Sequence, residues 1–285
     1  MRIARVFPRK TNASPTDPLV FFGGPPMLFP PEVDAVHVSV TFLEDKHVAE
    51  RLAEAWEGVA PVTVGGPAYG DPGGEFTPGQ YLKPGCVITS RGCPNRCWFC
   101  MASKREGNIR ELPIRDGWNL MDNNILACSE SHVLAVFDML DRQAISPAFT
   151  GGLEAARLQD WHVNRLALLD PSVMWFAYDT PDDYEPLVIA GRKLTDAGFR
   201  VSSHTLCCYV LIGYPNDTMT AARVRLRDTM RAGFLPQAML YRDGNREPSR
   251  EWCRFQRLWA NRVITGSKMG SMEKARKRLE LKGNK

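Results

Sequence analysis

Short apolar runs rich in β-branched and aromatic residues recur along the chain from about residue 80 onward. Their starts are roughly 30 residues apart, which is the length of one β-strand plus a crossover helix. Amphipathic helical patterns fill the gaps, as at Ala222, Leu226 and Met230. The pattern therefore predicts alternating strands and helices. The six predicted strands are Cys86–Ser90, Trp118–Met121, Ile145–Phe149, Val173–Tyr178, Leu206–Ile212 and Gln237–Tyr241.

Six β/α units predict an α/β fold with a parallel sheet curved into a partial (β/α)6 TIM-like barrel. A closed eight-unit barrel would need about 250 residues for itself. In sheets of this kind the functional residues follow the carboxyl ends of the strands. The loops after the six runs are therefore where we look for chemistry.

A smaller pattern precedes the barrel. Ala35–Thr41 is typical of a strand, Glu44–Gly58 of a helix and Val62–Val64 of a second strand, which together make one small βαβ unit. The first 30 or so residues look irregular, and Gly65–Pro84 is rich in glycine and proline, as linkers are. We expect an N-terminal βαβ region with linker over 1–80, the barrel over 81–245, and a C-terminal helical extension with a basic tail over 246–285.

Composition changes this picture little. The 285 residues are 44% hydrophobic and 24% charged with a net charge of +4, which is typical of a soluble globular protein. The basic start MRIARVFPRK runs into TNASPTDP instead of an apolar stretch, and no run approaches the ~18 apolar residues of a membrane span. We expect a cytoplasmic protein with no membrane partner.

The segment directly after the first barrel strand carries the chemistry. Its sequence RGCPNRCWFC gives C-x3-C-x2-C, with Cys93, Cys97 and Cys100 on one loop. Thiolates are the preferred ligands of iron–sulfur clusters, and three of them leave one iron of a cubane open for reaction. A structural zinc site normally has four protein ligands. A fourth ligand from Cys86, Cys128 or a distant residue would complete such a site.

The motif, with Phe99 just before its last cysteine, resembles the signature of the radical S-adenosylmethionine (radical SAM) superfamily over about Val36–Arg242. The resemblance implies a 4Fe-4S cluster on the three cysteines whose open iron binds S-adenosylmethionine. Reductive cleavage would give a 5′-deoxyadenosyl radical that abstracts hydrogen from a substrate the sequence does not identify. It further implies that Phe99 cradles the adenine and that flavodoxin or ferredoxin donates the electron.

Family members hold the methionine amino group with Gly-Gly-Glu or Asp-Asp after the second barrel strand, where this chain has Asp122-Asn123-Asn124. The two asparagines form hydrogen bonds but supply no charge. The resemblance therefore assigns the ammonium group to Asp122, with Asn123 beside it, or to backbone carbonyls. The alternative is a helix N-cap in a βα loop.

The run Gly151-Gly152-Leu153-Glu154-Ala155-Ala156-Arg157 resembles Gly-Gly-Leu-Asp/Glu-Ala-Arg in relatives that also carry a cobalamin-binding domain. The resemblance implies that Gly151, Gly152 and Glu154 help to seat S-adenosylmethionine and that Arg157 binds its carboxylate. The alternative is a capped turn with a solvent salt bridge. Tyr178 and Asp179, at the end of the fourth strand, are either a pocket wall or part of a turn.

The N-terminal βαβ unit resembles a shortened cobalamin-binding domain. The Asp-x-His-x-x-Gly signature of such domains is absent, and one βαβ unit is too small to cradle a corrinoid, so we expect no cobalamin. Cys207 and Cys208 lie side by side in an apolar strand and point to opposite faces, as expected for core thiols rather than joint ligands.

Two other functions fit parts of the sequence. A non-catalytic iron–sulfur or zinc scaffold, or a redox sensor, would use the cysteines but would have no affinity for S-adenosylmethionine. A nucleic-acid-modifying member would use the basic tail Lys268–Lys285 and would bind in a salt-sensitive way.

Overall fold

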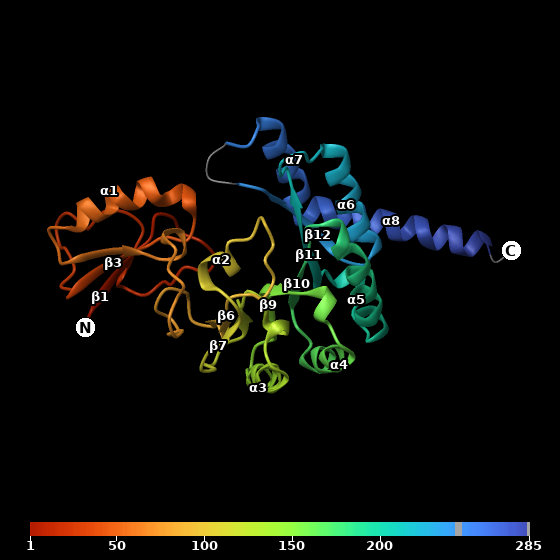
Figure 1. The fold of residues 1–285 in the computed structure, drawn as a ribbon, viewed down its shortest axis with the longest axis horizontal. Coiled ribbons are helices and arrows are strands. Elements are labelled where there is room, and N and C mark those ends of the chain that lie inside the picture. Colours follow the sequence, from red (N-terminus) through yellow and green to blue (C-terminus); the bar gives the residue numbers. More distant parts are fainter. Residues whose placement is uncertain (243–246, 284–285) are drawn as a thin grey trace. The chain divides into compact units, whose positions relative to one another are not determined.

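A computed structural model describes residues 1–242 and 247–283, with side chains up to residue 272. The chain forms two compact units that meet in sequence between Asn123 and Asn124 (Figure 1). The domain boundaries expected at 80/81 and 245/246 stay predictions, and the second lies outside the described residues. The side chains of most of the basic tail also lie outside them.

An open parallel sheet forms the N-terminal part of the first unit. Its strands have the order β2-β1-β3-β4, and α1 connects β3 to β4. The expectation of a single βαβ unit after an irregular start is therefore wrong, because the first thirty residues add two strands. The elements are β1 (Ile3–Val6), β2 (Val20–Phe21), β3 (Ala35–Ser39), α1 (Lys46–Trp56) and β4 (Val62–Gly65).

The missed strand β1 lies between two other strands and carries an arginine. Arg5 is only 9% exposed, and its guanidinium forms an ion pair with Asp17 and donates to the carbonyl oxygens of Gly79 and Gln80. A buried cation is tolerated when it is paired and hydrogen-bonded. These partners come from distant parts of the chain, so the basic sequence around Arg5 did not indicate a buried strand.

Helix α1 packs on this sheet through one face. Ala49, Leu52 and Trp56 recur at helical spacing and are buried against Val36 and Val38 of β3. The Trp56 indole also donates to the carbonyl oxygen of Gly23 at 2.9 Å. The helix predicted for 44–58 is thus present.

The remainder of the first unit holds the predicted cysteine loop. Strands β5 (Cys86–Val87) and β8 (Asn119–Leu120) pair in parallel, as the first two predicted barrel strands should. Between them, β6 (Ser90–Arg91) and β7 (Arg110–Glu111) form an antiparallel ribbon. The short helix α2 (Ala102–Glu106) lies between the ribbon strands in sequence.

The second unit is built on four parallel strands in spatial order β9-β10-β11-β12. They are β9 (Ala148–Leu153), β10 (Val173–Tyr178), β11 (Leu206–Ile212) and β12 (Leu235–Leu240). Its helices are α3 (Glu130–Asp141), α4 (Asp160–Leu169), α5 (Tyr184–Asp196), α6 (Met219–Arg231), α7 (Arg250–Ala260) and α8 (Arg262–Gly283). The predicted strands 173–178 and 206–212 are confirmed to the residue. The alternation of strand and crossover helix is confirmed as well.

Strand β9 differs from the prediction for 145–149. It starts later and continues through Gly151 and Gly152, whereas the sequence pattern places these two glycines in the loop after the strand. Phe149 pairs with Met174 and Leu153 with Phe176, so β9 has a bulge at the glycines. Glycine usually marks such a bulge in a strand, and here it was misread as the end of the strand.

Helices α5 and α6 cover one face of these strands. Phe176 of β10 packs edge-on against Phe234, with ring centroids 5.1 Å apart. On α5, Gly191 lets the helix approach closely, because a Cβ there would lie 2.0 Å from the carbonyl oxygen of Ala232.

Across the described part of the chain, no helix combines the length and the apolar character needed to cross a bilayer.

Candidate functional site

The three motif cysteines lie on a hairpin loop within the first unit. The β6–β7 ribbon closes the base of this loop, with Ser90 opposite Glu111 and Arg91 opposite Arg110. Just inside the ribbon, the Cys93 amide donates to the carbonyl oxygen of Gly107 at 3.1 Å. The loop therefore begins and ends at one fixed place, although its cysteines are partly exposed.

Asp122 holds the strand that leads into this loop. Its carboxylate accepts hydrogen bonds from the Thr89 amide at 2.7 Å, the Thr89 hydroxyl at 2.7 Å and the Ser90 hydroxyl at 2.5 Å. Asp122 is 1% exposed, and both residues it binds are fully buried. Hydrogen bonds to a buried carboxylate are among the strong ones. Asp122 is distant from the loop in sequence, but it binds Thr89 and Ser90, which lie just before Cys93. The structure thus places Asp122 as an anchor of the loop.

Glu106 performs a similar task at the other end of the loop. It ends α2, and its carboxylate accepts from the Gly92 amide at 2.9 Å and from the side-chain amide of Asn123. Arg105 forms an ion pair with it, and the Glu106 side chain is only 3% exposed. Asn123, expected at the cofactor, is therefore joined to the cysteine loop through Glu106. No local sequence pattern indicates this role of Glu106, because its partners meet only when the hairpin closes.

Gly92 makes the close approach between the two ends possible. Its φ is +81°, and a Cβ there would lie 2.2 Å from the carbonyl oxygen of Asn108. An L-residue at this position would be strained by its backbone conformation and by this contact. Glycine is therefore required directly before Cys93.

The donor set of the loop fits an iron–sulfur cluster. The Cys100 sulfur accepts from the Ala102 amide at 3.4 Å, a contact that also stabilises a thiolate. Within the described residues, no three His, Cys, Asp or Glu side chains are gathered as a ready-made ion site. Three thiols on a single loop with pinned ends match the ligand chemistry of such a cluster, which itself sets the sulfur positions on binding.

Phe99 lies on the same loop beside a second aromatic ring. It meets Trp98 edge-on, with centroids 5.4 Å apart and planes at 89°. Trp98 is 50% exposed. Two neighbouring rings between the last two cysteines give the loop an apolar surface suited to a planar group.

The other predicted cofactor residues lie in the second unit. Glu154 follows β9, and its Oε2 accepts from the Asn124 side-chain amide and from Arg157 Nε, each at 2.6 Å. The structure thus brings Asn124, Glu154 and Arg157 together beside the bulge at Gly151 and Gly152. The Glu154–Arg157 pair is the salt bridge of the alternative interpretation. Both side chains are partly exposed, at 24% and 39%.

Tyr178 ends β10, and Asp179 follows it directly. The Tyr178 ring is buried on the helix-covered side and stacks on Tyr184 of α5, with centroids 5.6 Å apart. One oxygen of the Asp179 carboxylate accepts from the Leu211 amide at 3.1 Å. Burial, and then the nearby Asp183, raises the pKa of Asp179 to about 7. Asp179 is therefore a buried carboxyl that titrates near neutral pH.

Cys207 and Cys208 have the surroundings of core thiols, as expected. Both are 0% exposed in β11. Burial raises the pKa of Cys207 to about 11 and that of Cys208 above its usual value. Both side chains are therefore protonated at neutral pH and poor ligands for a metal.

Comparison with known proteins rests on structure. No protein-family model matches the chain, and no curated protein matches it in sequence. Four solved chains match it. One is TsrM of Kitasatospora setae, a radical S-adenosylmethionine methyltransferase whose structure has cobalamin and a [4Fe-4S] cluster bound.

The similarity to TsrM has a TM-score of 0.53 at 12% sequence identity, and it covers 74% of this chain. The chain spans 64% of the length of TsrM. At this identity the likeness concerns the fold. The chain therefore resembles a radical S-adenosylmethionine enzyme in its fold, as the motif at Cys93, Cys97 and Cys100 led us to expect.

Proposed function

We propose that this protein is a radical SAM enzyme that binds a 4Fe-4S cluster through Cys93, Cys97 and Cys100. The observation that carries the proposal is a C-x3-C-x2-C loop with fixed ends in a chain whose fold resembles a radical SAM enzyme. When bound, the cluster and S-adenosylmethionine would supply a one-electron cleavage that generates a hydrogen-abstracting radical.

The chain's own contribution at the cluster is to place three thiolates. Asp122 fixes the strand before Cys93, and Glu106 fixes the Gly92 amide next to it. We assign these two acids to positioning, because Asp122 already accepts three hydrogen bonds and is only 1% exposed, which disfavours the expected ammonium-binding role. Asn123, whose side-chain amide donates to Glu106, supports the same anchor, and we keep it as a proposed neighbour of the cofactor.

In the second unit, we propose that Glu154 and the bulge at Gly151 and Gly152 contact S-adenosylmethionine. Asn124 and Arg157 fix the Glu154 carboxylate in one orientation. The missing side chains of the two glycines leave backbone groups accessible to a ligand. We keep Phe99 as the adenine contact on the cysteine loop, whereas the stacking of Tyr178 under α5 favours a packing role for that residue.

Cobalamin is not part of the proposal. One of our two reasons for this, the small size of the N-terminal unit, is wrong, because its sheet has four strands. The absence of Asp-x-His-x-x-Gly from the sequence remains. A small iron–sulfur or flavin protein of the ferredoxin or flavodoxin type is the proposed electron donor, and the substrate stays unassigned.

The test is formation of 5′-deoxyadenosine. The full chain is reconstituted anaerobically with iron and sulfide, reduced with dithionite and incubated with S-adenosylmethionine. We expect the nucleoside from the wild type and from Cys253→Ser, a matched control outside the loop, but not from Cys97→Ser. A stable cluster that never cleaves S-adenosylmethionine would instead support the scaffold or sensor, and tetrahedral zinc in place of iron would refute the cluster.

A further inference from the structure

A crevice lies in the N-terminal sheet at the position where open parallel sheets bind ligands. From β1 the chain passes to β2 on one side, whereas from β3 it passes through α1 to β4 on the other. The connections after two neighbouring strands therefore separate. Such a switch point leaves a crevice at the carboxyl ends of the strands, which is the usual binding position in this architecture.

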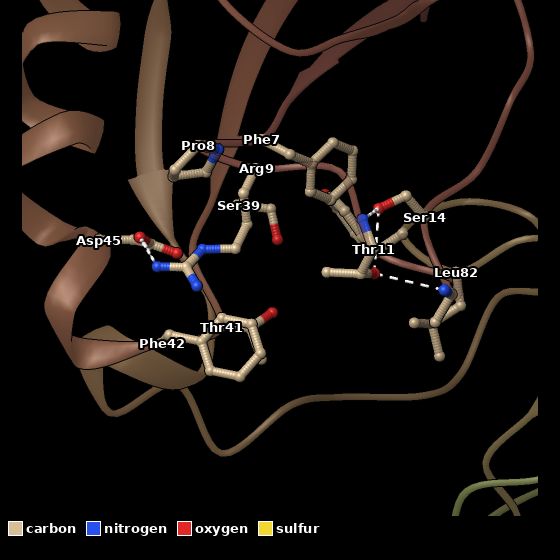
Figure 2. Close-up of a pocket in the computed structure, with 12 residues that line it drawn as sticks. Phe7, Pro8, Arg9, Thr11, Ser14, Ser39, Thr41, Phe42, Asp45 and Leu82 are labelled. Carbon is tan, nitrogen blue, oxygen red and sulfur yellow. Dashed lines mark hydrogen bonds and ion pairs between the residues drawn. The ribbon is translucent and has the colours of Figure 1, made fainter. Parts of the chain in front are cut away.

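The structure shows a cavity of about 50 Å³ at this point (Figure 2). Pro8 and Arg9 follow β1, Thr41 and Phe42 follow β3, and Tyr81 comes from the linker. The Tyr81 hydroxyl is 2.5 Å from His37 Nδ1 of β3, and the Lys83 amide donates to the carbonyl oxygen of Ala13 at 2.9 Å. The linker is thus attached to the sheet and provides a third wall.

The charged side chains at the crevice are one arginine and two carboxylates. Arg9 extends across it to Asp45, with which it forms an ion pair above the Phe42 ring (Figure 2). Asp45 is 6% exposed, and Glu44 lies 3.8 Å from the same guanidinium. One cation against two carboxylates makes the region unfavourable for phosphate or another anion. It suits a neutral group that both donates to Asp45 and accepts from Arg9.

Hydroxyl groups line the rest of the cavity, from Thr11, Ser14, Ser39 and Thr41. Arg–Asp pairs, hydroxyls and an aromatic ring together match the vicinal hydroxyls and the apolar face of a sugar ring. The cavity has room for about four water molecules, hence for one edge of a five-membered ring and not for a macrocycle.

We propose that this crevice binds the vicinal diol of a ribose-type sugar, with Asp45 accepting from one hydroxyl and Arg9 donating to the other. The proposal is independent of the cluster and of S-adenosylmethionine cleavage. It gives the N-terminal sheet a binding role for which the residues at its switch point are suited.

The test is saturation-transfer NMR on the full chain with methyl β-D-ribofuranoside, compared with its 2-deoxy analogue, which lacks one hydroxyl of the diol. We expect binding of the riboside and at least about tenfold weaker binding of the deoxy analogue, because one hydrogen bond to a charged group is lost. Thr41→Tyr, which fills the crevice from an exposed position, and Asp45→Asn should abolish the riboside signal.

Glu50→Gln, the same type of change at an exposed site on α1, should leave riboside binding unaltered. Equal binding of the two sugars, no riboside signal from the wild type, or a signal that survives Thr41→Tyr would each refute the proposal. Hydroxocobalamin binding that Thr41→Tyr removes would refute it as well, in favour of a corrinoid site.

Discussion

Asp122 offers a direct way to separate a positioning role from a cofactor-binding role. Replacing it with alanine removes three hydrogen bonds from the buried contact with Thr89 and Ser90. The two hydroxyls can turn toward other acceptors, but the Thr89 amide is fixed by the backbone and loses its partner. An orphaned buried amide costs about 1–3 kcal/mol, and each lost bond to a charged group costs about 1.5 kcal/mol or more. Because such terms are not additive, we expect a loss of about 3–5 kcal/mol in the free energy of unfolding.

The assay is urea unfolding of the apo chain, followed by far-UV circular dichroism. Asp116→Ala is the matched control, because Asp116 is exposed and should change stability by less than about 0.5 kcal/mol. Asp122→Ala should also bind less iron on reconstitution, since the loop entrance is released. Wild-type stability in Asp122→Ala, combined with a loss of S-adenosylmethionine affinity, would refute the positioning role and restore the ammonium-binding role.

Three further predictions follow from the structure. Gly92→Ala should destabilise the chain by about 2 kcal/mol or more and lower its iron content. Gly74→Ala is the control and should do neither, because a Cβ at Gly74 meets open space. Urea unfolding and iron assays check both variants. Burial, aided by Lys193, lowers the pKa of His162 to about 4, so the contribution of this imidazole to stability should fall by up to about 3 kcal/mol from pH 6.5 to 4. The difference in melting temperature between wild type and His162→Gln should therefore change over this pH range. Folding raises the pKa of Asp179 to about 7, so the contribution of this carboxyl to stability should decrease as pH rises from about 4 to 7, opposite in sign to that of His162. Asp179→Asn should therefore melt higher than wild type at pH 8 but not at pH 4.

The sequence predicted the elements whose side chains carry the signal locally. Two continuous apolar runs of the second unit are strands with the predicted bounds, 173–178 and 206–212. Strand β1 was missed because Arg5 is satisfied by Asp17 and by linker carbonyls far away in the chain. The extent of β9 was missed because Gly151 and Gly152 form a bulge that looks like a turn in the sequence.

At the candidate site, too, local sequence signals were predictive, whereas contacts between distant residues were not. The spacing of the three cysteines is local and was readable from the sequence. The roles of Asp122 and Glu106 depend on which backbone amides and hydroxyls the hairpin brings to them, which no local pattern reveals. The pKa of Asp179 could not be predicted either, because it is set mainly by burial, a property of the folded unit.

The most direct test of the central claim is EPR spectroscopy of the reduced, reconstituted chain with and without S-adenosylmethionine. A cluster held by Cys93, Cys97 and Cys100 has one iron without a protein ligand, so adding S-adenosylmethionine should change the signal. The change should be absent from Cys97→Ser and present in Cys253→Ser. A reduced cluster in the wild type whose signal is the same with and without S-adenosylmethionine would contradict the account.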